Sequence, residues 1–408
     1  MGGNGGTISG KNRGRQADIV ILRVPDYYEE FSCIASRCKD SCCAGWEIDI
    51  DEDSYAYYRS CEGTFGDRLR ESMYVAEDGG YRFKLKGPKR CAMLNDNNLC
   101  DLYTALGEEA LCEVCTEYPR FSLFYGNVEQ KCLSLSCEEV GRILFEKENS
   151  ITLVDHEMPD YYECGEEAEA CDEDEDPAYI AFMEQVQERA VGILQDRSRS
   201  IEERMCGFLS FCSSAQDVIN HYQAKGDSAL LQIPAEYYAV EESVSGKNVS
   251  MQWNRAFSYT DFKDRFSVFM DMEELDDEWV NTKREFGELF HEDTYEKLLT
   301  EYLASPDYSE IGYEQLLVYF TFRYLMNAVY DYDLISYARL VVVATLVVRD
   351  MDAVRFQRNG GHFTTFDRID IARIFSKEVE HSEGNADALK EMCMMEEIAS
   401  LDALSRQI

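Results

Sequence analysis

The chain has 408 residues and a hydrophobic content of 45%, enough for two or three domains with real cores. It carries 79 acidic against 40 basic side chains, which gives a net charge of −39. Nucleic acid and anionic membrane surfaces attract Lys and Arg, so this charge argues against both as partners. We interpret it as a solvated acidic surface that could also attract a cationic group. The longest nearly apolar run, Leu340 to Val348, is too short for a membrane span.

The first residues, MGGNGGTISGKNRGRQ, are polar and Gly-rich and lack the apolar segment of a signal peptide. We expect residues 1–18 to form a disordered leader. The chain contains 16 cysteines. Without a signal peptide, we expect these thiols to be reduced in a cytoplasmic protein, where clustered thiols indicate metal or redox chemistry.

Residues 19–150 predict a small cysteine-rich module of short elements. Pro25 opens a short helix that continues through Phe31. Apolar side chains alternate with acidic ones from Trp46 to Ile50, which predicts a half-buried strand. A short helix is expected to follow over residues 52–59.

A hairpin is predicted later in the same module. Two β-prone runs, residues 121–125 and 128–135, flank Gly126 and Asn127, a typical hairpin turn pair. Ser136, followed three residues later by Glu139, predicts a capping box that starts a helix through about Phe145.

The rest of the chain is expected to be helical. An acidic run over residues 163–177 predicts a solvated linker, and residues 178–408 predict a helical domain. Apolar periodicity predicts helices over residues 178–194, 201–222, 257–272, 276–290, 315–329, 334–348, 367–379 and 386–401. Aromatic residues recur at helical spacing near residue 320, and we interpret them as core packing. The predicted fold class is therefore α+β, mostly α, with the small module preceding the helical domain.

Eleven of the cysteines lie between Cys33 and Cys137, and this asymmetry is the main organisational signal of the sequence. Thiolates are soft ligands that suit zinc and iron–sulfur clusters. Cys112 and Cys115 have the two-residue spacing common in such sites. We predict metal binding by nine of these thiols: Cys33, Cys38, Cys42, Cys43, Cys91, Cys100, Cys112, Cys115 and Cys137.

The sequence leaves the number and kind of metal sites open. No histidine falls in this region, so the ligands are expected to be all cysteine, as in many iron–sulfur and structural zinc sites. Nine thiols could fill one site with spares or two sites. Adjacent Cys42 and Cys43 are not expected to bind one mononuclear ion together, so one of them serves a second site or a redox role. We interpret Cys61, Cys132 and the C-terminal cysteines as buried apolar residues.

Several segments resemble the flagellin lysine-N-methylases and the broader zinc- or iron-chelating cysteine-rich domain. In the module these are VPDYYEEFSCIASRCKDSCCAGWEIDID, CAMLNDNNLCDLYTALGEEALCEVCTEYPRF and LSLSCEE. In the C-terminal half they are QLLVYFTFRYLMNAVYD and IARIFSKEVEHSEGN. The resemblance covers about residues 21–401. It implies methyl transfer from S-adenosylmethionine to lysine side chains of flagellin in the cytoplasm, with an iron–sulfur cluster or zinc as cofactor.

The common S-adenosylmethionine motifs are absent from the sequence. No strand–GxGxxG–helix pattern occurs, and Gly45 stands where the third cysteine of a Cys-x3-Cys-x2-Cys motif would follow Cys38 and Cys42. An iron–sulfur methylase would therefore use a different ligand arrangement. A non-enzymatic metal-binding or redox-sensing adaptor is the alternative interpretation.

Lysine methylation requires a neutral amine, although the ordinary lysine pKa is about 10.4. His381, flanked by Glu378 and Glu380 in SKEVEHSEGN, is a candidate polar cluster for this task, although a surface histidine at a helix end is the simpler interpretation. Two family-like segments, SCCAGWEID and SKEVEHSEGN, lie at opposite ends of the chain. We expect the donor and substrate sites to meet where the module contacts the C-terminal helices, with Trp46, His381 and Glu378 as candidate catalytic residues.

Overall fold

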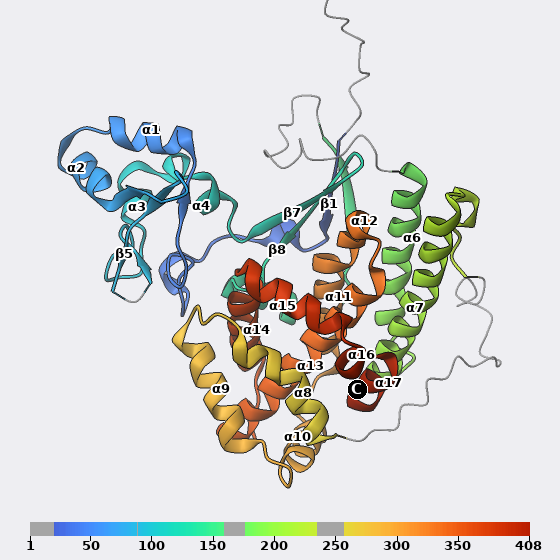
Figure 1. Cartoon of the computed structure of the whole chain (residues 1–408). Coiled ribbons are helices and arrows are strands. Elements are labelled where there is room, and N and C mark those ends of the chain that lie inside the picture. Colours follow the sequence, from blue (N-terminus) through green and yellow to red (C-terminus); the bar gives the residue numbers. More distant parts are fainter. Residues whose placement is uncertain (1–19, 88, 159–175, 235–256) are drawn as a thin grey trace, which may run out of the picture.

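The computed structural model describes residues 20–87, 89–158, 176–234 and 257–408. The predicted leader, most of the acidic linker, Cys164 and Cys171 lie outside these residues. The described part contains a thiol-rich lobe, a four-stranded sheet and a large helical domain (Figure 1). The predicted class, α+β and mostly α, is confirmed.

The four-stranded sheet joins segments that are far apart in the sequence. Its order is β7-β8-β1-β9, with β1 parallel to β8 and antiparallel to β9. Its strands are β1 (Ile21–Pro25), β7 (Arg120–Tyr125), β8 (Val128–Leu133) and β9 (Leu153–Glu157). The predicted hairpin forms its β7–β8 edge, where Gly126 adopts the left-handed conformation that such turns require, with φ of 55°. The sheet and α5 (Glu138–Glu146) pack on the helical domain.

The cysteine lobe, residues 43–117, folds around a small core of its own. Apolar side chains from Ile48 to Leu102 surround the buried thiols of Cys91 and Cys112 in this core. The lobe contains α1 (Glu52–Ser60), α2 (Gly63–Ser72), α3 (Asp101–Leu106), α4 (Glu113–Glu117), β2 (Asp49–Ile50), β3 (Met73–Val75), β4 (Tyr81–Phe83), β5 (Leu85–Lys86) and β6 (Arg90–Cys91). In Figure 1 the lobe projects away from the helical domain.

The helical domain is built around one central helix, α13 (Leu334–Arg358). Buried residues cover nearly all of α13, as expected of a helix enclosed by other helices. The other helices of this domain are α6 (Pro177–Leu194), α7 (Ile201–Lys225), α8 (Tyr259–Asp271), α9 (Asp277–Leu289), α10 (Tyr295–Leu303), α11 (Glu310–Tyr324), α12 (Ala328–Asp331), α14 (Thr365–Val379), α15 (Glu383–Met394), α16 (Glu396–Ala399) and α17 (Leu401–Gln407). No helix among the described residues is long and apolar enough to cross a membrane.

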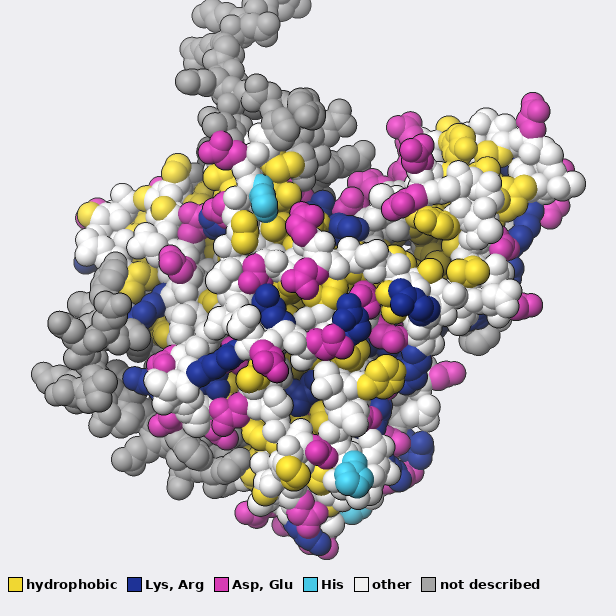
Figure 2. All heavy atoms as spheres, turned by 180° about the vertical axis from the view of Figure 1, so that it is seen from behind, with side chains coloured by type: hydrophobic (Ala, Val, Ile, Leu, Met, Phe, Trp, Pro, Cys, Tyr) yellow, Lys and Arg dark blue, Asp and Glu magenta, His cyan; other side chains and the backbone are white. Residues whose placement is uncertain are grey.

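Basic and acidic side chains are interspersed on the face shown in Figure 2. Despite the net charge of −39, this face is not uniformly acidic. The charge therefore gives this face no single electrostatic preference.

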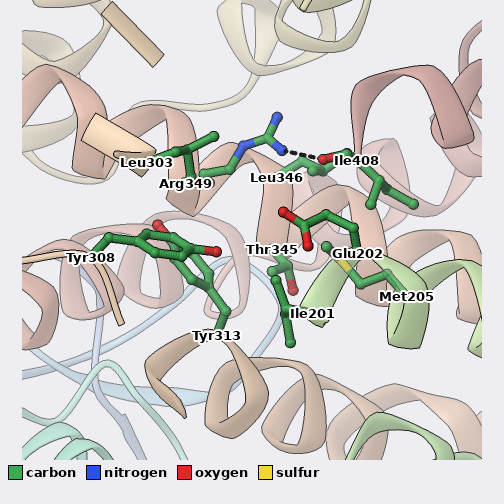
Figure 3. A pocket seen from close by; sticks show the side chains of 10 residues that line it. All are labelled: Ile201, Glu202, Met205, Leu303, Tyr308, Tyr313, Thr345, Leu346, Arg349 and Ile408. Carbon is green, nitrogen blue, oxygen red and sulfur yellow. Dashed lines mark hydrogen bonds between the residues drawn. The ribbon is translucent and has the colours of Figure 1, made fainter. Parts of the chain in front are cut away.

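A small cavity lies where α7 meets α13 (Figure 3). It encloses about 10 Å³, which is room for about one water molecule. Arg349 lines it and donates to the carbonyl oxygen of Ile408 at 3.4 Å, while Nε and Nη2 of Arg349 lack hydrogen-bond partners among the described residues. The cavity is too small for a substrate.

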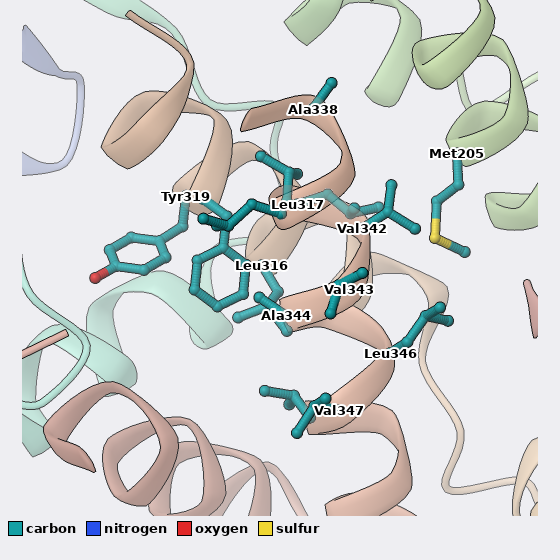
Figure 4. Packing of buried hydrophobic residues seen from close by; sticks show 14 of the residues in the cluster. Met205, Leu316, Leu317, Tyr319, Ala338, Val342, Val343, Ala344, Leu346 and Val347 are labelled. Atoms are coloured by element: carbon teal, nitrogen blue, oxygen red, sulfur yellow. The ribbon is translucent and has the colours of Figure 1, made fainter. Parts of the chain in front are cut away.

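Elsewhere α13 is tightly packed. Figure 4 shows aliphatic side chains of α13, such as Val342 and Val347, beside those of α11 and Met205 of α7. The aromatic residues of α11 belong to this core: Tyr319 and Phe320 are each 1% exposed. The interpretation of the aromatic stripe as core packing is confirmed here, although Tyr330 is exposed.

Several local predictions differ from the structure. Pro25 ends β1, and only a short 3-10 turn, Tyr28–Glu30, follows it. Cys137, not Ser136, is the N-cap of α5, and it makes no side-chain capping bond. The predicted module of residues 19–150 divides between two cores, because the sheet and α5 join the helical core.

A buried ion cluster joins α7 to α11, and substitutions in it test how much it stabilises the helical domain. Glu314, 1% exposed, accepts hydrogen bonds from Arg197 and Arg204, and Arg204 also contacts the half-exposed Glu310. Replacing Glu314 with Gln leaves buried Arg204 without its main counter-charge. We expect Glu314→Gln to lower the free energy of unfolding by about 3–5 kcal/mol in denaturant titrations.

The matched control is Glu310→Gln, which removes the exposed partner of the same arginine. It should cost less than about 1 kcal/mol, because solvent screens an exposed pair. Equal effects of the two substitutions would contradict the assignment of Glu314 as the buried counter-ion.

Candidate functional site at the junction

The cysteine lobe and the helical domain meet at three aromatic rings. Trp46 follows the Cys42–Cys43 pair, Tyr118 ends α4, and His381 follows α14. The rings of Trp46 and His381 stack with centroids 4.8 Å apart and planes 17° apart. The Tyr118 ring lies 5.9 Å from Trp46 and 6.0 Å from His381. The structure thus brings together two of the three predicted catalytic residues, and all three rings are half-buried.

Hydroxyl groups connect this aromatic cluster to the interior. Nε2 of His381 lies 2.7 Å from Oγ of Ser136 and 3.1 Å from Oγ of Ser134. The Tyr118 hydroxyl lies 3.1 Å from the same Ser136 oxygen. Oγ of Ser134 also lies 3.2 Å from Oγ of Ser376, within hydrogen-bond distance. The use of the Ser136 hydroxyl by His381 and Tyr118 explains why Ser136 does not cap α5.

The hydroxyl chain ends at a buried carboxylate, Glu380. Ser376 donates to Oε2 of Glu380, and Tyr319 donates to the same oxygen at 2.8 Å. Tyr324 donates to Oε1 at 2.9 Å, and Arg323 lies 3.5 Å from that oxygen. A continuous path of polar atoms therefore joins the aromatic cluster to an ion pair, a geometry that can hold or pass a proton.

His381 is held neutral at this site. Burial, followed by the nearby charges of Arg323 and Lys377, lowers the pKa of His381 from 6.5 to about 4. A neutral imidazole can both donate and accept hydrogen bonds. His381 is therefore available as an acceptor at neutral pH.

The side chain of Glu378, the third predicted catalytic residue, points away from the ring cluster toward the start of α9. Its carboxylate accepts hydrogen bonds from the backbone N–H groups of Leu275 at 2.8 Å and Asp276 at 3.2 Å, in the connection before α9. Burial raises the pKa of Glu378 to about 7. The structure gives Glu378 a role in holding α9, and its predicted catalytic role has no contact with the ring cluster to support it.

Ion pairs hold the lobe in this position. Asp40, in the cysteine segment, bonds to Arg373 at 2.9 Å and to Lys377 at 2.5 Å, both on α14. Arg373 is 1% and Lys377 2% exposed, so their charges need partners. Asp276 and Glu278 complete the network. Oxygens of these two residues and Asp40 lie within 4.8 Å of one another, and each of the three carboxylates already pairs with Arg373 or Lys377.

Gly45 allows Lys377 to approach the Trp46 segment. A Cβ at Gly45 would lie 2.7 Å from Cε of Lys377, and Gly45 has φ of 109°. The Lys377 ammonium then lies 5.5 Å from the Trp46 ring centroid. A glycine is therefore required here both by backbone conformation and by space.

Five of the predicted metal-binding cysteines gather in the lobe: Cys43, Cys91, Cys100, Cys112 and Cys115, here called the core group. Cys91 and Cys112 are buried in the small core, and the other three pack against it. The backbone N–H of Cys91 donates to the carbonyl of Cys43 at 2.8 Å, and Cys115 lies one helical turn from Cys112. Burial and the neighbouring thiols Cys43, Cys100 and Cys112 raise the pKa of Cys91 to about 12.

Three others gather beside α5: Cys33, Cys38 and Cys137, which with Cys42 are here called the junction group. The backbone N–H of Lys39 donates to Glu138 at 2.6 Å, which brings Cys38 beside Cys137 at the start of α5. Burial and then Cys137 raise the pKa of Cys38 to about 12. Cys42 is exposed, and its sulfur lies 4.0 Å from that of Cys43.

The other described cysteines, Cys61, Cys132, Cys206, Cys212 and Cys393, were not predicted as metal ligands. Cys132 is 1% exposed, and burial raises its pKa to about 12. Cys206, Cys212 and Cys393 are buried in the helical core. Their interpretation as buried apolar residues is confirmed, and Cys61 is partly buried against the small core.

Sequence reasoning missed Ser134, Ser136 and Ser376 as members of the site, whereas Glu380 was expected beside His381. The serines are small and polar, and no spacing rule distinguishes them. The sequence signal that could have identified them is their position within LSLSCEE and SKEVEHSEGN, the two segments that resemble the family. Every one of these residues lies inside those two segments.

The fold has two apolar cores, one in the thiol-rich lobe and one in the helical domain. The candidate site lies where these two parts meet, and aromatic rings and hydroxyl groups form it. Residues 187–406 match the FliB lysine N-methylase C-terminal domain. This match covers more than half of the chain, so the chain belongs to the FliB lysine N-methylase family. No solved structure matches it.

Curated relatives agree with the family. The chain is 31% identical over 131 residues to the lysine-N-methylases of Salmonella typhimurium and Salmonella choleraesuis. This alignment covers 31% of the chain and 33% of either relative, so the chain matches only a third of their length. It is 32% identical over 131 residues to the flagellar biosynthetic protein FliU of Salmonella muenchen, covering 31% of the chain and 78% of that protein.

The lowered pKa of His381 predicts a specific pH dependence of stability. Between pH 6.5 and about 4 the unfolded chain binds a proton at His381 that the folded chain refuses, so stability falls as pH falls through this window. His381→Gln, which cannot titrate, should lose about 1–3 kcal/mol less free energy of unfolding over this window than the parent protein. Denaturant titrations at several pH values measure this difference.

The control for this experiment is His221→Gln, because His221 is exposed on α7. It should follow the parent protein at every pH. An unchanged pH dependence in His381→Gln would show that His381 is not held neutral by its surroundings.

The close approach at Gly45 gives a second test. Gly45→Ala requires the end of Lys377, which pairs with Asp40 and Asp276, to shift, whereas Gly79→Ala, also at positive φ, meets no atom within 4 Å. Both variants carry the strain of a left-handed alanine, about 1–2 kcal/mol. We expect Gly45→Ala to lower the melting temperature further, and an equal loss in both would contradict the contact.

Proposed function

We propose that this protein transfers methyl groups from S-adenosylmethionine to lysine side chains of flagellin in the cytoplasm. The family carries the lysine N-methylase part of this proposal. The flagellar name of one relative supports flagellin as the substrate. The observation that supports a catalytic centre is the junction, where Trp46, Tyr118 and His381 meet a hydroxyl chain that leads to Glu380.

The transfer needs a balanced movement of bonds and a proton. The bond between the sulfonium sulfur and the methyl carbon breaks, and a bond from that carbon to the lysine nitrogen forms. The donor leaves as neutral S-adenosylhomocysteine, and the lysine nitrogen loses a proton. Methyl transfer also requires the sulfur, carbon and nitrogen to be aligned at close range, so the donor and lysine pockets must meet.

The junction residues suit these tasks. Because its pKa of about 4 disfavours the imidazolium, His381 can only relay the lysine proton to Ser136 and Ser134, from which the chain through Ser376 can pass it toward Glu380. An aromatic ring face such as that of Tyr118 favours the positive charge of a sulfonium or an ammonium group, whereas the Trp46 ring already stacks on His381 and lies beside the Lys377 ammonium. The buried position of the cluster disfavours a charged lysine and so lowers its pKa.

The cysteines suit a cofactor. The donors are all thiols, and we propose an iron–sulfur cluster, with zinc as the alternative. Among the described residues no three cysteine sulfurs lie within 4.8 Å of one another. Thiolates of one tetrahedral zinc, with bonds of about 2.3 Å, lie only about 3.8 Å apart. Thiolates of a cluster bind different irons and lie further apart, and a cluster would supply electron-transfer chemistry when bound.

The direct test is mass spectrometry of a cognate flagellin incubated with the protein and S-adenosylmethionine. We expect methyl-sized mass steps on lysines. His381→Phe keeps a ring to stack on Trp46 but loses the hydrogen bonds, and it should lower the initial rate about 100-fold or more. The control His221→Phe, far out on α7, should keep the parent rate.

The outcome against this proposal is equally specific. With cofactor content verified, a flagellin that gains no methyl groups would favour the alternative, a metal-binding or redox-sensing adaptor. Full activity of His381→Phe, with methylation intact, would keep the function and remove the junction as its centre.

A further inference from the structure

We propose that a basic hollow in the cysteine lobe binds the carboxylate of a small ligand, and that this carboxylate is the amino-acid end of the methyl donor. The hollow has a volume of about 410 Å³, and its lining comes from α2, the β5–β6 hairpin and the turn that leads into α3. The charged residues of this lining are Arg68, Lys86, Arg90, Asp96 and Asp101. The choice of ligand rests on the proposed function, whereas the carboxylate site itself does not.

Lys86 and Arg90 place two positive charges side by side in the hollow. They lie directly opposite each other in the antiparallel β5–β6 pair. Opposite side chains project from the same face with Cβ atoms only about 4.5–5.5 Å apart, and like charges in these positions destabilise the pair. An anion bound between the two side chains removes this repulsion.

Neither cation has a carboxylate of its own among the described residues. Arg90 donates to the side-chain oxygen of Asn98 at 2.9 Å and to the carbonyl oxygen of Asn95 at 3.3 Å, and both oxygens are neutral. Asp101 feels the charge of Lys86, but both of its oxygens already accept other partners. The hollow therefore keeps two positive charges available to a ligand.

The rest of the lining is held in place by its own contacts. Asp101 pairs with Arg68 at 2.6 Å and accepts a hydrogen bond from the Asn95 side chain at 2.7 Å. The Asn95 side-chain oxygen in turn accepts from the backbone N–H groups of Asn97 and Leu99, at 2.9 and 3.1 Å. The turn beside the cations is thus ordered by the chain itself, which lowers the entropy cost of binding a ligand there.

The chemistry of the lining suits an α-amino acid group. A guanidinium and an ammonium bind a carboxylate through charge-assisted hydrogen bonds. The exposed carboxylate of Asp96, in the same lining, suits an ammonium group on the adjacent carbon. Inorganic phosphate satisfies the two cations but meets Asp96 as a like charge. S-adenosylmethionine, the donor of the proposed function, carries such an amino-acid end.

The hairpin that carries both cations also contacts the segment of Trp46. Arg90 pairs with Ala44 in an isolated bridge, and the backbone N–H of Gly45 donates to the carbonyl oxygen of Lys89 at 2.8 Å. The Lys89 ammonium donates to two backbone carbonyls in the connection before α9. These contacts connect the hollow to the junction, where the proposed transfer takes place.

Isothermal titration calorimetry of the full chain with S-adenosylhomocysteine tests the proposal. This probe keeps the amino-acid end and has no methyl group to transfer. Lys86→Gln removes the repulsion and breaks no side-chain hydrogen bond to a described residue, so the variant should fold. We expect it to bind the probe about tenfold more weakly than the parent protein, because a charge-assisted contact is lost.

Two controls separate the carboxylate from the rest of the ligand and of the lobe. Methylthioadenosine lacks the amino-acid end and should bind the parent protein and Lys86→Gln equally. Lys84→Gln makes the same charge change in the lobe at an exposed residue that bonds to the Glu71 carbonyl and does not line the hollow. It should bind S-adenosylhomocysteine as the parent protein does.

Three results would overturn the proposal. The first is equal affinity of the parent protein and Lys86→Gln for S-adenosylhomocysteine. The second is an equal loss of affinity for methylthioadenosine, since the carboxylate would then not be the group that is bound. The third is a loss of inorganic phosphate binding alone, which would assign the hollow to a different anion.

Methylation assays separate this inference from the proposed function. Probe binding that depends on Lys86, without methylation of flagellin, would keep the donor site and reject the proposed substrate. Methylation of flagellin by Lys86→Gln with the parent KM for S-adenosylmethionine would keep the proposed function and reject the hollow.

Discussion

The structure depends on one electrostatic constraint, the pairing of two buried cations on α14 with Asp40. Arg373 and Lys377 are almost fully buried, and unpaired charges in such places cost several kcal/mol. Asp40 lies between Cys38 and Cys42, so the same residue that satisfies α14 also positions the cysteine segment. Asp276 and Glu278 also pair with these cations, so Asp40 is the partner that ties this ion network to the cysteine segment, while the apolar core of the lobe stays separate from that of the helical domain.

The chemistry of the junction follows from this docking. The Asp40 contact sets the path of the chain through Gly45, and Trp46 then lies on His381. Neither partner forms a site alone, because Trp46 comes from the lobe segment and His381 from the end of α14. The serines that bind His381 come from a third segment, after β8.

Local elements could be predicted from the sequence, and non-local ones could not. The β7–β8 hairpin and helices such as α6 followed from a turn pair and from helical periodicity. Strand β1 was missed because its partners, β8 and β9, lie more than a hundred residues away. Ser136 was predicted as a cap because a local rule allowed it, whereas its hydroxyl binds His381, 245 residues later.

The candidate site was predictable only in outline. Resemblance marked the segments around Trp46 and His381, and the expectation that they meet agrees with the structure. Their stacking, the hydroxyl chain and the role of Asp40 depend on tertiary contacts that no spacing encodes. The direction of Glu378 toward α9 is another such case, since its neighbour Glu380 is the residue that joins the polar chain.

The central claim is that docking by Asp40 assembles the reactive centre, and one measurement tests it directly. Methyl transfer to flagellin is compared between Asp40→Asn and the control Asp155→Asn, which removes a partner of Arg23 on β1, an ion pair outside the junction. Both proteins are first shown to be folded and to carry full metal. The account predicts at least a roughly tenfold lower rate for Asp40→Asn and the parent rate for the control, since small misplacements of reacting groups are costly. A parent-like rate for Asp40→Asn would contradict it.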